Sequence, residues 1–507
     1  MEFKGTRPWV FFPPLILLFV AIAASVIESE GFLTVSKAAN TWILDNFAGG
    51  FSVVAFVMII LCVLTMISPL GKMRIGGKEA KPLLSRWRWF GIILCTTVAT
   101  GILFWGTAEP LYHLNSPPDF AGAIAGSEAA SRFSLSVMFT HWSIAPYAIY
   151  AVPALVFALA YYNFGSRFSL SATLNPLLKS DWHGPVGTVI DAVSLFALVA
   201  GMAASLGAGI LTLSGGLQKL FGLESSVLLL AAICLLIVVT FLISAASGLL
   251  KGIRVLSNIN VIIFIGLALF VFVFGPTKSI LTQAASGLGA YVSNFWELHM
   301  SSLTHPESQW PKSWTVFYWA NWMAWAPITA LFLGRISRGY TVREFLLFNW
   351  IIPALFSIAW MSIFSGTTLH MELEGSVALG ESLKSQGEES VIYLLLEQLP
   401  LLKVILPIFI FTVFLSYVTA ADSNTAAMAG ISAKGITPEN PEPPLFPKII
   451  WGLTIGAMAL TMVATAGIDG IKMLSNLGGL PILFLLAFVA IALGKMIWES
   501  FRTNRSK

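Results

Sequence analysis

The chain has 507 residues, of which 57% are hydrophobic and 11% are charged, and its formal net charge is +4. This number of charged residues is too small to cover the surface of a water-soluble domain. The composition therefore excludes a soluble fold and indicates a helical protein that crosses a membrane several times. The small positive charge lies in loops, which argues for membrane orientation and against nucleic-acid binding. Three isolated cysteines in apolar stretches argue against a disulfide framework.

Twelve apolar stretches have about the 20 residues that a helix needs to cross a bilayer. We expect these spans at 9–27, 51–68, 89–108, 134–162, 186–213, 225–246, 255–275, 313–334, 345–365, 401–428, 447–466 and 473–497. Lys and Arg gather before the first span, in the even-numbered connections and after the last span. The positive-inside rule therefore predicts that both termini are cytoplasmic.

The connection between the seventh and eighth predicted spans is longer than the others. In it, Tyr291, Phe295, Trp296 and Leu298 recur at roughly helical spacing, in a segment too short to span. This pattern predicts an amphipathic helix that lies at the outer surface of the membrane.

The eighth predicted span is unusual because it concentrates tryptophan. Trp319, Trp322 and Trp325 are three residues apart, so on a helix they form one slowly rotating stripe, and Trp314 precedes them. One explanation is an aromatic belt at the membrane surface, where Trp is enriched. The alternative is an aromatic box, because indole faces attract a cation that has no N–H to donate, such as a quaternary ammonium. The depth of these residues within the span favours the box.

A second aromatic set lies in the fourth predicted span, where Trp142, Tyr147 and Tyr150 flank Pro146. Trp142 and Tyr150 are eight residues apart and share roughly one helix face. Core packing would also explain them. Together with Pro327 in the Trp-rich span, however, two helix-breaking prolines beside two aromatic clusters fit a box between helices near the middle of the membrane.

Two further spans offer oxygen ligands for a small cation. The tenth ends in FLSYVTAADSNTAAMAG, which contains Thr419 and Asp422. The third contains CTTVATGILFWGTAEP, whose glycines permit either close helix packing or an unwound backbone with free carbonyls. An ionisable residue within a span is a functional candidate, although the position of Asp422 near the cytoplasmic end also fits capping or pairing.

The sequence contains no catalytic constellation. None of its six histidines has metal-ligand spacing with another, and it has no P-loop pattern. These observations favour a secondary transporter over an enzyme, with a membrane sensor or channel as the alternative that the polar helices suggest.

Over most of its length the chain resembles the betaine/choline/carnitine transporter (BCCT) family. The most specific motif is WTVFYWANW at 314–322 followed by GRISRGYTVRE at 334–344, and FWGTAEP at 104–110, KGIRVLSN at 251–258 and VTAADS at 418–423 support it. The resemblance implies an all-α, LeuT-type fold of two inverted five-helix repeats behind two extra N-terminal helices. It also implies a homotrimer in the plasma (inner) membrane, alternating access, no enzymatic activity and no cofactor apart from sodium as a coupling ion.

On this basis the chain divides into five parts. We expect an N-terminal tail and two peripheral helices over 1–88, the first repeat over 89–275, an external amphipathic helix and loop over 276–312, the second repeat over 313–498, and a short cytoplasmic tail over 499–507.

The resemblance also implies where a substrate binds. The family's box residues carry over to Trp142, Tyr147, Tyr150, Trp322 and Trp325, so the expected substrate carries a trimethylammonium group, as glycine betaine, choline and carnitine do. The chain departs from the family at two positions that usually hold Trp. Tyr147 keeps an aromatic face, whereas Asn321 replaces it with a hydrogen-bond donor and acceptor, so we expect Asn321 to affect which ligand is bound.

The coupling ion follows less directly from the resemblance. Sodium-coupled members resemble one another in an unwound third span and a Thr-Ser pair in the tenth, whereas here Thr419 is followed by Ala and the third span offers Thr97 and Thr100. Sodium-independent carnitine exchangers resemble one another in an Arg at the position of Asn260. We therefore expect sodium symport through one site centred on Thr419, with Thr97, Thr100 and Asp422 as further ligands. Exchange of the carnitine/γ-butyrobetaine type, without an ion gradient, is the alternative.

Overall fold

The computed structural model describes residues 5–97, 101–178, 184–246, 252–437, 440 and 442–505. Within these ranges the chain is helical and has no strand, only isolated bridges that join Thr6 to Ala433 and Arg74 to Thr341. The predicted all-α class is therefore confirmed.

The helices follow one another along the chain as follows. They are α1 (Pro8–Ile27), α2 (Ser29–Ile67), η1 (Pro69–Lys72), α3 (Arg86–Thr97), α4 (Gly101–Asn115), η2 (Asp119–Ala121), α5 (Glu128–Trp142), α6 (Ile144–Asn163), η3 (Leu170–Leu174), α7 (Asn175–Leu178), α8 (Pro185–Phe221), α9 (Val227–Ala246), α10 (Gly252–Phe274), α11 (Thr277–Ser293), α12 (Phe295–His299), α13 (Ser301–Thr304), the π-helical turn η4 (Lys312–Val316), α14 (Phe317–Ile336), α15 (Val342–Leu346), the π-helical turn η5 (Leu347–Ile351), α16 (Ile352–Leu373), α17 (Leu379–Gln386), α18 (Glu388–Glu397), α19 (Leu402–Ser432) and α20 (Leu445–Arg505).

Nine helical segments of the described chain are long and apolar enough to cross a membrane, and the bent pair α3–α4 makes a tenth. The last helix, α20, is two helices, because Gly467 has φ 52° and ψ −133° and bends it between the predicted spans 447–466 and 473–497. Only glycine adopts such a conformation without strain. α14 fills the predicted span 313–334 but falls below the hydropathy of the other spans. The total of twelve spans stays a prediction.

Two of the predicted spans are broken. The span predicted at 89–108 consists of α3 and α4, which meet at 52°. The span predicted at 134–162 breaks at Ser143, which has φ −118° and ψ −107° and separates α5 from α6. Pro146 stands in the first turn of α6, where its missing N–H costs no helical hydrogen bond.

The prediction that Pro327 breaks its helix is wrong. α14 continues through Pro327 to Ile336, because a helix that neighbours surround on all sides tolerates one lost backbone hydrogen bond. α14 packs against α6, α8 and α20, and all of its residues except Asn321 are buried. This burial also explains its lower hydropathy, since a helix that faces protein needs less apolar surface than one that faces lipid.

The aromatic pattern after the seventh span belongs to two helices, because the chain breaks at Asn294 between α11 and α12. Tyr291 and Leu298 are each 4% exposed, whereas Trp296 is 57% exposed. The predicted amphipathic character is therefore present, but it is shared between α11 and the short α12.

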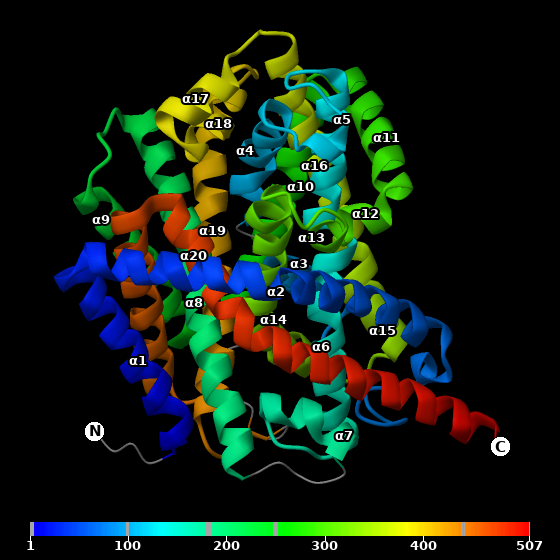
Figure 1. The fold of residues 1–507 in the computed structure, drawn as a ribbon. Coiled ribbons are helices and arrows are strands. Elements are labelled where there is room, and N and C mark those ends of the chain that lie inside the picture. Colours follow the sequence, from blue (N-terminus) through cyan, green and yellow to red (C-terminus); the bar gives the residue numbers. More distant parts are fainter. Residues whose placement is uncertain are drawn as a thin grey trace.

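Both termini lie at one end of the molecule, and α17 and α18 lie at the opposite end (Figure 1). At the end that holds the termini, the buried carboxylate of Asp191 accepts hydrogen bonds from Ser169 and lies 2.7 Å from the guanidinium of Arg7. This pairing gives the intramembrane Asp191 a structural role, since a buried charge requires a partner.

Candidate functional site

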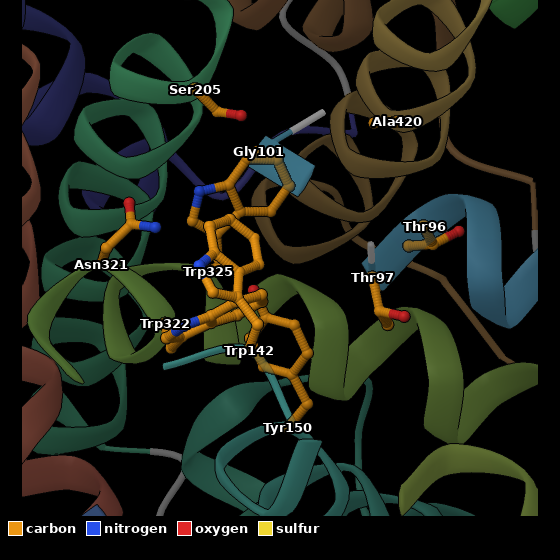
Figure 2. A pocket seen from close by; sticks show the side chains of 10 residues that line it. All are labelled: Thr96, Thr97, Gly101, Trp142, Tyr150, Ser205, Asn321, Trp322, Trp325 and Ala420. Atoms are coloured by element: carbon orange, nitrogen blue, oxygen red, sulfur yellow. The ribbon is translucent and has the colours of Figure 1, made fainter. Parts of the chain in front are cut away.

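A small cavity of about 40 Å³ lies at the centre of the helices. It is lined by residues of α3, α4, α5, α6, α8, α14 and α19, namely Thr96, Thr97, Gly101, Trp142, Tyr150, Ser205, Asn321, Trp322, Trp325 and Ala420. Figure 2 shows the four aromatic rings together in the middle, with Asn321 on one side and the two threonines on the other. The structure thus brings together two aromatic sets that lie more than 150 residues apart in the sequence.

Trp322 is the hub of the aromatic cluster. Its ring centroid lies 5.4 Å from that of Trp142 and 5.3 Å from that of Tyr150, with interplanar angles of 83° and 70°. Such edge-to-face contacts point ring faces in different directions around one space. A cation in that space would meet several π faces at once.

The polar edges of the three indoles are held by the scaffold. Trp142 donates its Nε1–H to Oε2 of Glu109 at 2.9 Å, Trp322 donates to the carbonyl of His141 at 3.0 Å, and Trp325 donates to the carbonyl of Gly201 at 3.0 Å. These bonds fix the ring orientations and leave the ring faces for a ligand. The cavity therefore suits a ligand that needs π faces and no hydrogen-bond donor from the indoles.

Gly101, the first residue of α4, allows α4 to approach Trp142. A Cβ at this position would lie 2.6 Å from Cη2 of Trp142, which is closer than any side chain tolerates. The glycine is thus required by the close approach of backbone and ring rather than by its own backbone angles.

Two predicted substrate residues lie differently from the rest. Tyr147 does not line the cavity; its ring lies behind Trp322 at 6.3 Å, and its hydroxyl is 2.7 Å from that of Ser357. Asn321 lines the cavity, and its Oδ1 accepts a hydrogen bond from Ser475 at 3.0 Å. This bond turns the amide nitrogen of Asn321 toward the rings (Figure 2).

The predicted ion ligands are spread over a wider region. Thr97 lines the cavity, and its hydroxyl also donates to the carbonyl of Ile93 at 2.8 Å. Thr419 is adjacent to the cavity-lining Ala420, and its hydroxyl donates to its own helix. Asp422 lies one turn further along α19. The predicted ligand Thr100 lies outside the described residues.

Asp422 has its own partner. Its Oδ2 accepts a hydrogen bond from Ser244 of α9 at 2.5 Å, and it does not line the cavity. This geometry matches the pairing role that the sequence leaves open for this carboxylate. Its assignment as an ion ligand stays a prediction.

Asn260 occupies the position at which the resemblance places an Arg in exchangers. Its amide donates to Ser416 of α19 at 3.0 Å and lies 3.7 Å from Cys95 of α3. The side chain is fully buried and joins three helices without carrying a charge.

The most polar feature beside the cavity is the carboxylate of Glu109, which the sequence analysis did not single out. Its side chain is fully buried and accepts from four groups: Trp142 at 2.9 Å, Tyr318 at 2.5 Å, His141 at 2.6 Å and His113 at 3.2 Å. The donors come from three helices, so the network fixes α4 against α5 and α14. A buried charge is tolerated only when it is satisfied in this way.

The structure brings together two histidines that show no metal-ligand spacing in the sequence. Glu109, His113 and His141 offer three ligand atoms within 4.8 Å of one another, a set that could hold a metal ion. Hydrogen bonding explains the set as well, because Nε2 of His141 also lies 3.1 Å from Oγ1 of Thr315. Histidines 28 residues apart on separate helices leave no spacing signal in the sequence.

The other two tryptophans of the eighth span, Trp319 and Trp314, do not line the cavity. Trp319 is fully buried and stacks on His299 with a centroid distance of 5.8 Å and an angle of 15°. Burial lowers the pKa of His299 to about 4, so this histidine is neutral and serves as a flat packing partner. Trp314 also lies away from the cavity.

These features define a polytopic helical membrane protein with a central aromatic cavity suited to a cation. The sequence profile described as BCCT, betaine/carnitine/choline family transporter, matches residues 9–502. The glycine betaine transporter OpuD of Bacillus subtilis (strain 168) is 32% identical over 93% of this chain and 91% of its own length. The high-affinity choline transport protein of Escherichia coli (strain K12) is 30% identical over 97% of this chain and 72% of its own.

A third relative, the ectoine/hydroxyectoine transporter of Virgibacillus pantothenticus, is 28% identical over 96% of both chains. The chain belongs to the betaine/carnitine/choline transporter family, and it is a transporter rather than an enzyme. Among solved structures, a Na⁺-coupled sialic acid symporter in a substrate-bound outward-open state matches 87% of this chain and 81% of its own at 13% identity, with a TM-score of 0.42.

Proposed function

We propose that this protein imports a compound with a trimethylammonium group, such as glycine betaine, choline or carnitine, by sodium symport with alternating access. The observation that carries the proposal is the ring geometry around Trp322, where indole N–H groups are tied to the scaffold and indole faces line the cavity. A cation without N–H donors is the ligand that such faces bind best. Relatives named for glycine betaine and choline support this substrate class.

The size of the cavity supports alternating access. A space of about 40 Å³ holds roughly three water molecules. A trimethylammonium compound therefore enters only when the rings separate. The break at Ser143 divides α5 from α6, which both line the cavity, so it is a point at which this segment can bend.

Sodium coupling is proposed from the oxygens on one side of the cavity. The hydroxyl of Thr97 at the cavity and that of Thr419, which is adjacent in sequence to the cavity-lining Ala420, offer hard ligands, which small cations prefer. Thr100 and Asp422 complete the predicted set. No lysine or arginine is among the lining residues that the structure describes, so nothing here takes the place of the ion. Asn260 likewise offers no guanidinium, which disfavours exchange without an ion gradient.

Uptake into proteoliposomes tests the proposal. Radiolabelled glycine betaine, choline and carnitine are offered with an inward sodium gradient and again with potassium in place of sodium. We expect saturable uptake of one or more of them that requires sodium. Absence of uptake of all three would exclude the substrate class, and full uptake without sodium would exclude sodium coupling.

A matched pair of variants tests the ion site. Thr419→Ala and Thr412→Ala each remove one buried hydroxyl of α19 that donates to its own helix, but only Thr419 is adjacent to the cavity. We expect Thr419→Ala to raise the sodium concentration for half-maximal uptake about tenfold, since one hard ligand is lost, and Thr412→Ala to leave it unchanged. Equal effects of the two variants would refute a site at Thr419.

We also propose a homotrimer in the plasma membrane, with two five-helix repeats and both termini cytoplasmic. The location of both termini at one end of the molecule supports the last point (Figure 1). Cys62, Cys95 and Cys234 are buried, so a cysteine added at the C-terminus would be the main target of a membrane-impermeant maleimide. Labelling only after permeabilisation would agree with the proposed orientation, and labelling of intact cells would reverse it.

A further inference from the structure

Lys472 places a positive charge in an aromatic cage that lies outside the central cavity. It lies five residues after the bend at Gly467, on the second half of α20. Its Nζ is 4.2 Å from the ring centroid of Trp314, 5.6 Å from that of Phe317 and 5.8 Å from that of Trp105. These three rings, from α4, η4 and α14, are called the lysine cage below. Each lies within the distance at which a ring face attracts an ammonium group.

The charge of Lys472 is not neutralised by direct contact. Among the described residues, its ammonium forms neither an ion pair nor a hydrogen bond, and the carboxylates whose charge acts on it from further away are Glu388, Asp469 and Glu109. Two of these are engaged elsewhere: Glu388 accepts from the hydroxyl of Tyr112 at 2.6 Å, and Glu109 holds the network beside Trp142. A half-buried ammonium without a counter-ion in contact acts on its surroundings over a longer range than a paired one.

A continuous run of rings connects the lysine cage to the central cavity. Trp105 lies 6.3 Å from Tyr318, and Tyr318 lies 5.3 Å from Trp142, which lines the cavity. Trp142 in turn lies 5.4 Å from Trp322. Lys472 therefore stands two rings away from the aromatic cluster, at the end of α14 opposite to Arg335.

We propose that Lys472 is a specificity-determining residue that disfavours substrates with a net positive charge, such as choline, relative to zwitterions, such as glycine betaine. This inference rests on the proposed transport of trimethylammonium compounds. Both compounds carry the cationic group that the rings attract, but only the zwitterion carries a carboxylate that cancels the net charge and is attracted by the ammonium of Lys472. Like charges brought together in a partly desolvated site repel, and this repulsion selects against the wrong partner.

The structural alternative is that Lys472 only fills the lysine cage as packing. Its stem would then contribute apolar contact, and its charge would have no effect on which substrate is taken up. The two readings differ in what happens when the charge is removed but the length is kept, which Lys472→Met achieves. Lys472→Arg keeps the charge and the stacking on aromatic rings.

The experiment measures uptake of choline and glycine betaine at equal concentrations by wild type, Lys472→Met and Lys472→Arg in proteoliposomes. The control is Lys495→Met on the same helix, where Nζ donates to the carbonyl of Pro176. We expect wild type to prefer glycine betaine, and Lys472→Met to raise the ratio of choline to glycine betaine uptake about tenfold. Lys472→Arg and Lys495→Met are expected to keep the wild-type ratio. Where the Met variant does not fold, Lys472→Gln serves in its place.

The outcomes separate this inference from the proposed function. If wild type transports either compound and Lys472→Met has the same ratio of choline to glycine betaine uptake as wild type, the inference is overturned and the proposed function stands. A wild type that prefers choline also overturns it. A wild type that transports neither choline nor glycine betaine overturns the inference, and a wild type that also fails to transport carnitine overturns the proposed function as well.

Discussion

Replacing Trp322 by Leu removes the ring on which the aromatic cluster converges. One favourable cation–π contact contributes about 0.5–2 kcal/mol, and 1.36 kcal/mol corresponds to a tenfold change, so losing one face weakens binding roughly 2- to 30-fold. Trp322 also contacts Trp142 at 5.4 Å and Tyr150 at 5.3 Å, so its loss removes an edge-to-face contact from each of two further rings of the cluster. We therefore expect the upper part of this range, with KM for the transported compound raised about tenfold or more.

The assay is initial-rate uptake in proteoliposomes, with protein content and thermal stability measured for each variant. Trp360→Leu is the matched control, because Trp360 is 1% exposed and stacks on Phe364 at 4.2 Å but does not line the cavity. Trp9→Leu is the surface control, since Trp9 is 77% exposed. An unchanged KM in Trp322→Leu, or an equal rise in Trp360→Leu, would refute the reasoning, because packing alone would then explain the result.

Two further predictions concern the approach of α4 to the cavity and the pH dependence of folding. Gly101→Ala should raise the KM for uptake several-fold, because the new Cβ would lie 2.6 Å from Trp142. Gly266→Ala is the control and should leave KM unchanged, because no atom lies within 4 Å of its new Cβ. Similar KM values for the two variants would count against the close approach of α4 to Trp142. In α18, outside the spans, burial raises the pKa of Glu389 to about 7 from 4.5. The folded protein therefore binds the proton of Glu389 more tightly than the unfolded chain does. This difference contributes fully to the free energy of unfolding below about pH 4.5, and the contribution is lost as the pH rises to about 7. Glu389→Gln should therefore melt at a higher temperature than wild type at pH 8 and with a flatter pH dependence, and parallel curves from pH 5 to 8 would contradict this.

The helical spans were largely predictable because apolar length is a strong signal in the sequence. The bend at Gly467 falls in the predicted connection between the spans at 447–466 and 473–497, where polar and small residues gather. The eighth span was counted among the apolar stretches, although α14 falls below the hydropathy of the other spans because it is buried inside the protein. Helix breaks were less predictable: Pro327 is accommodated within α14, whereas the fourth span breaks at Ser143, three residues before the Pro146 that was expected to interrupt it.

The parts of the candidate site that depend on one residue type were predictable from the sequence. The parts that depend on side chains from several helices meeting at one point were missed. Trp142, Tyr150, Trp322 and Trp325 stood out because aromatic residues were clustered in two spans, and all four line the cavity. The network around Glu109 has no such signal. Its donors come from three helices, and a single glutamate in an apolar span does not reveal which groups will satisfy it.

Glu109 connects the two regions that the proposals treat separately. Its Oε2 accepts from Trp142, which lines the cavity, and from Tyr318, which continues the run of rings toward Lys472. The same carboxylate therefore fixes a ring of the proposed substrate site and a ring of the run that connects this site to the lysine cage. Removing this acceptor would leave several buried donors without a partner, and each such loss costs about 1–3 kcal/mol. The orientation of the aromatic faces thus depends on a polar network that never has to touch the substrate.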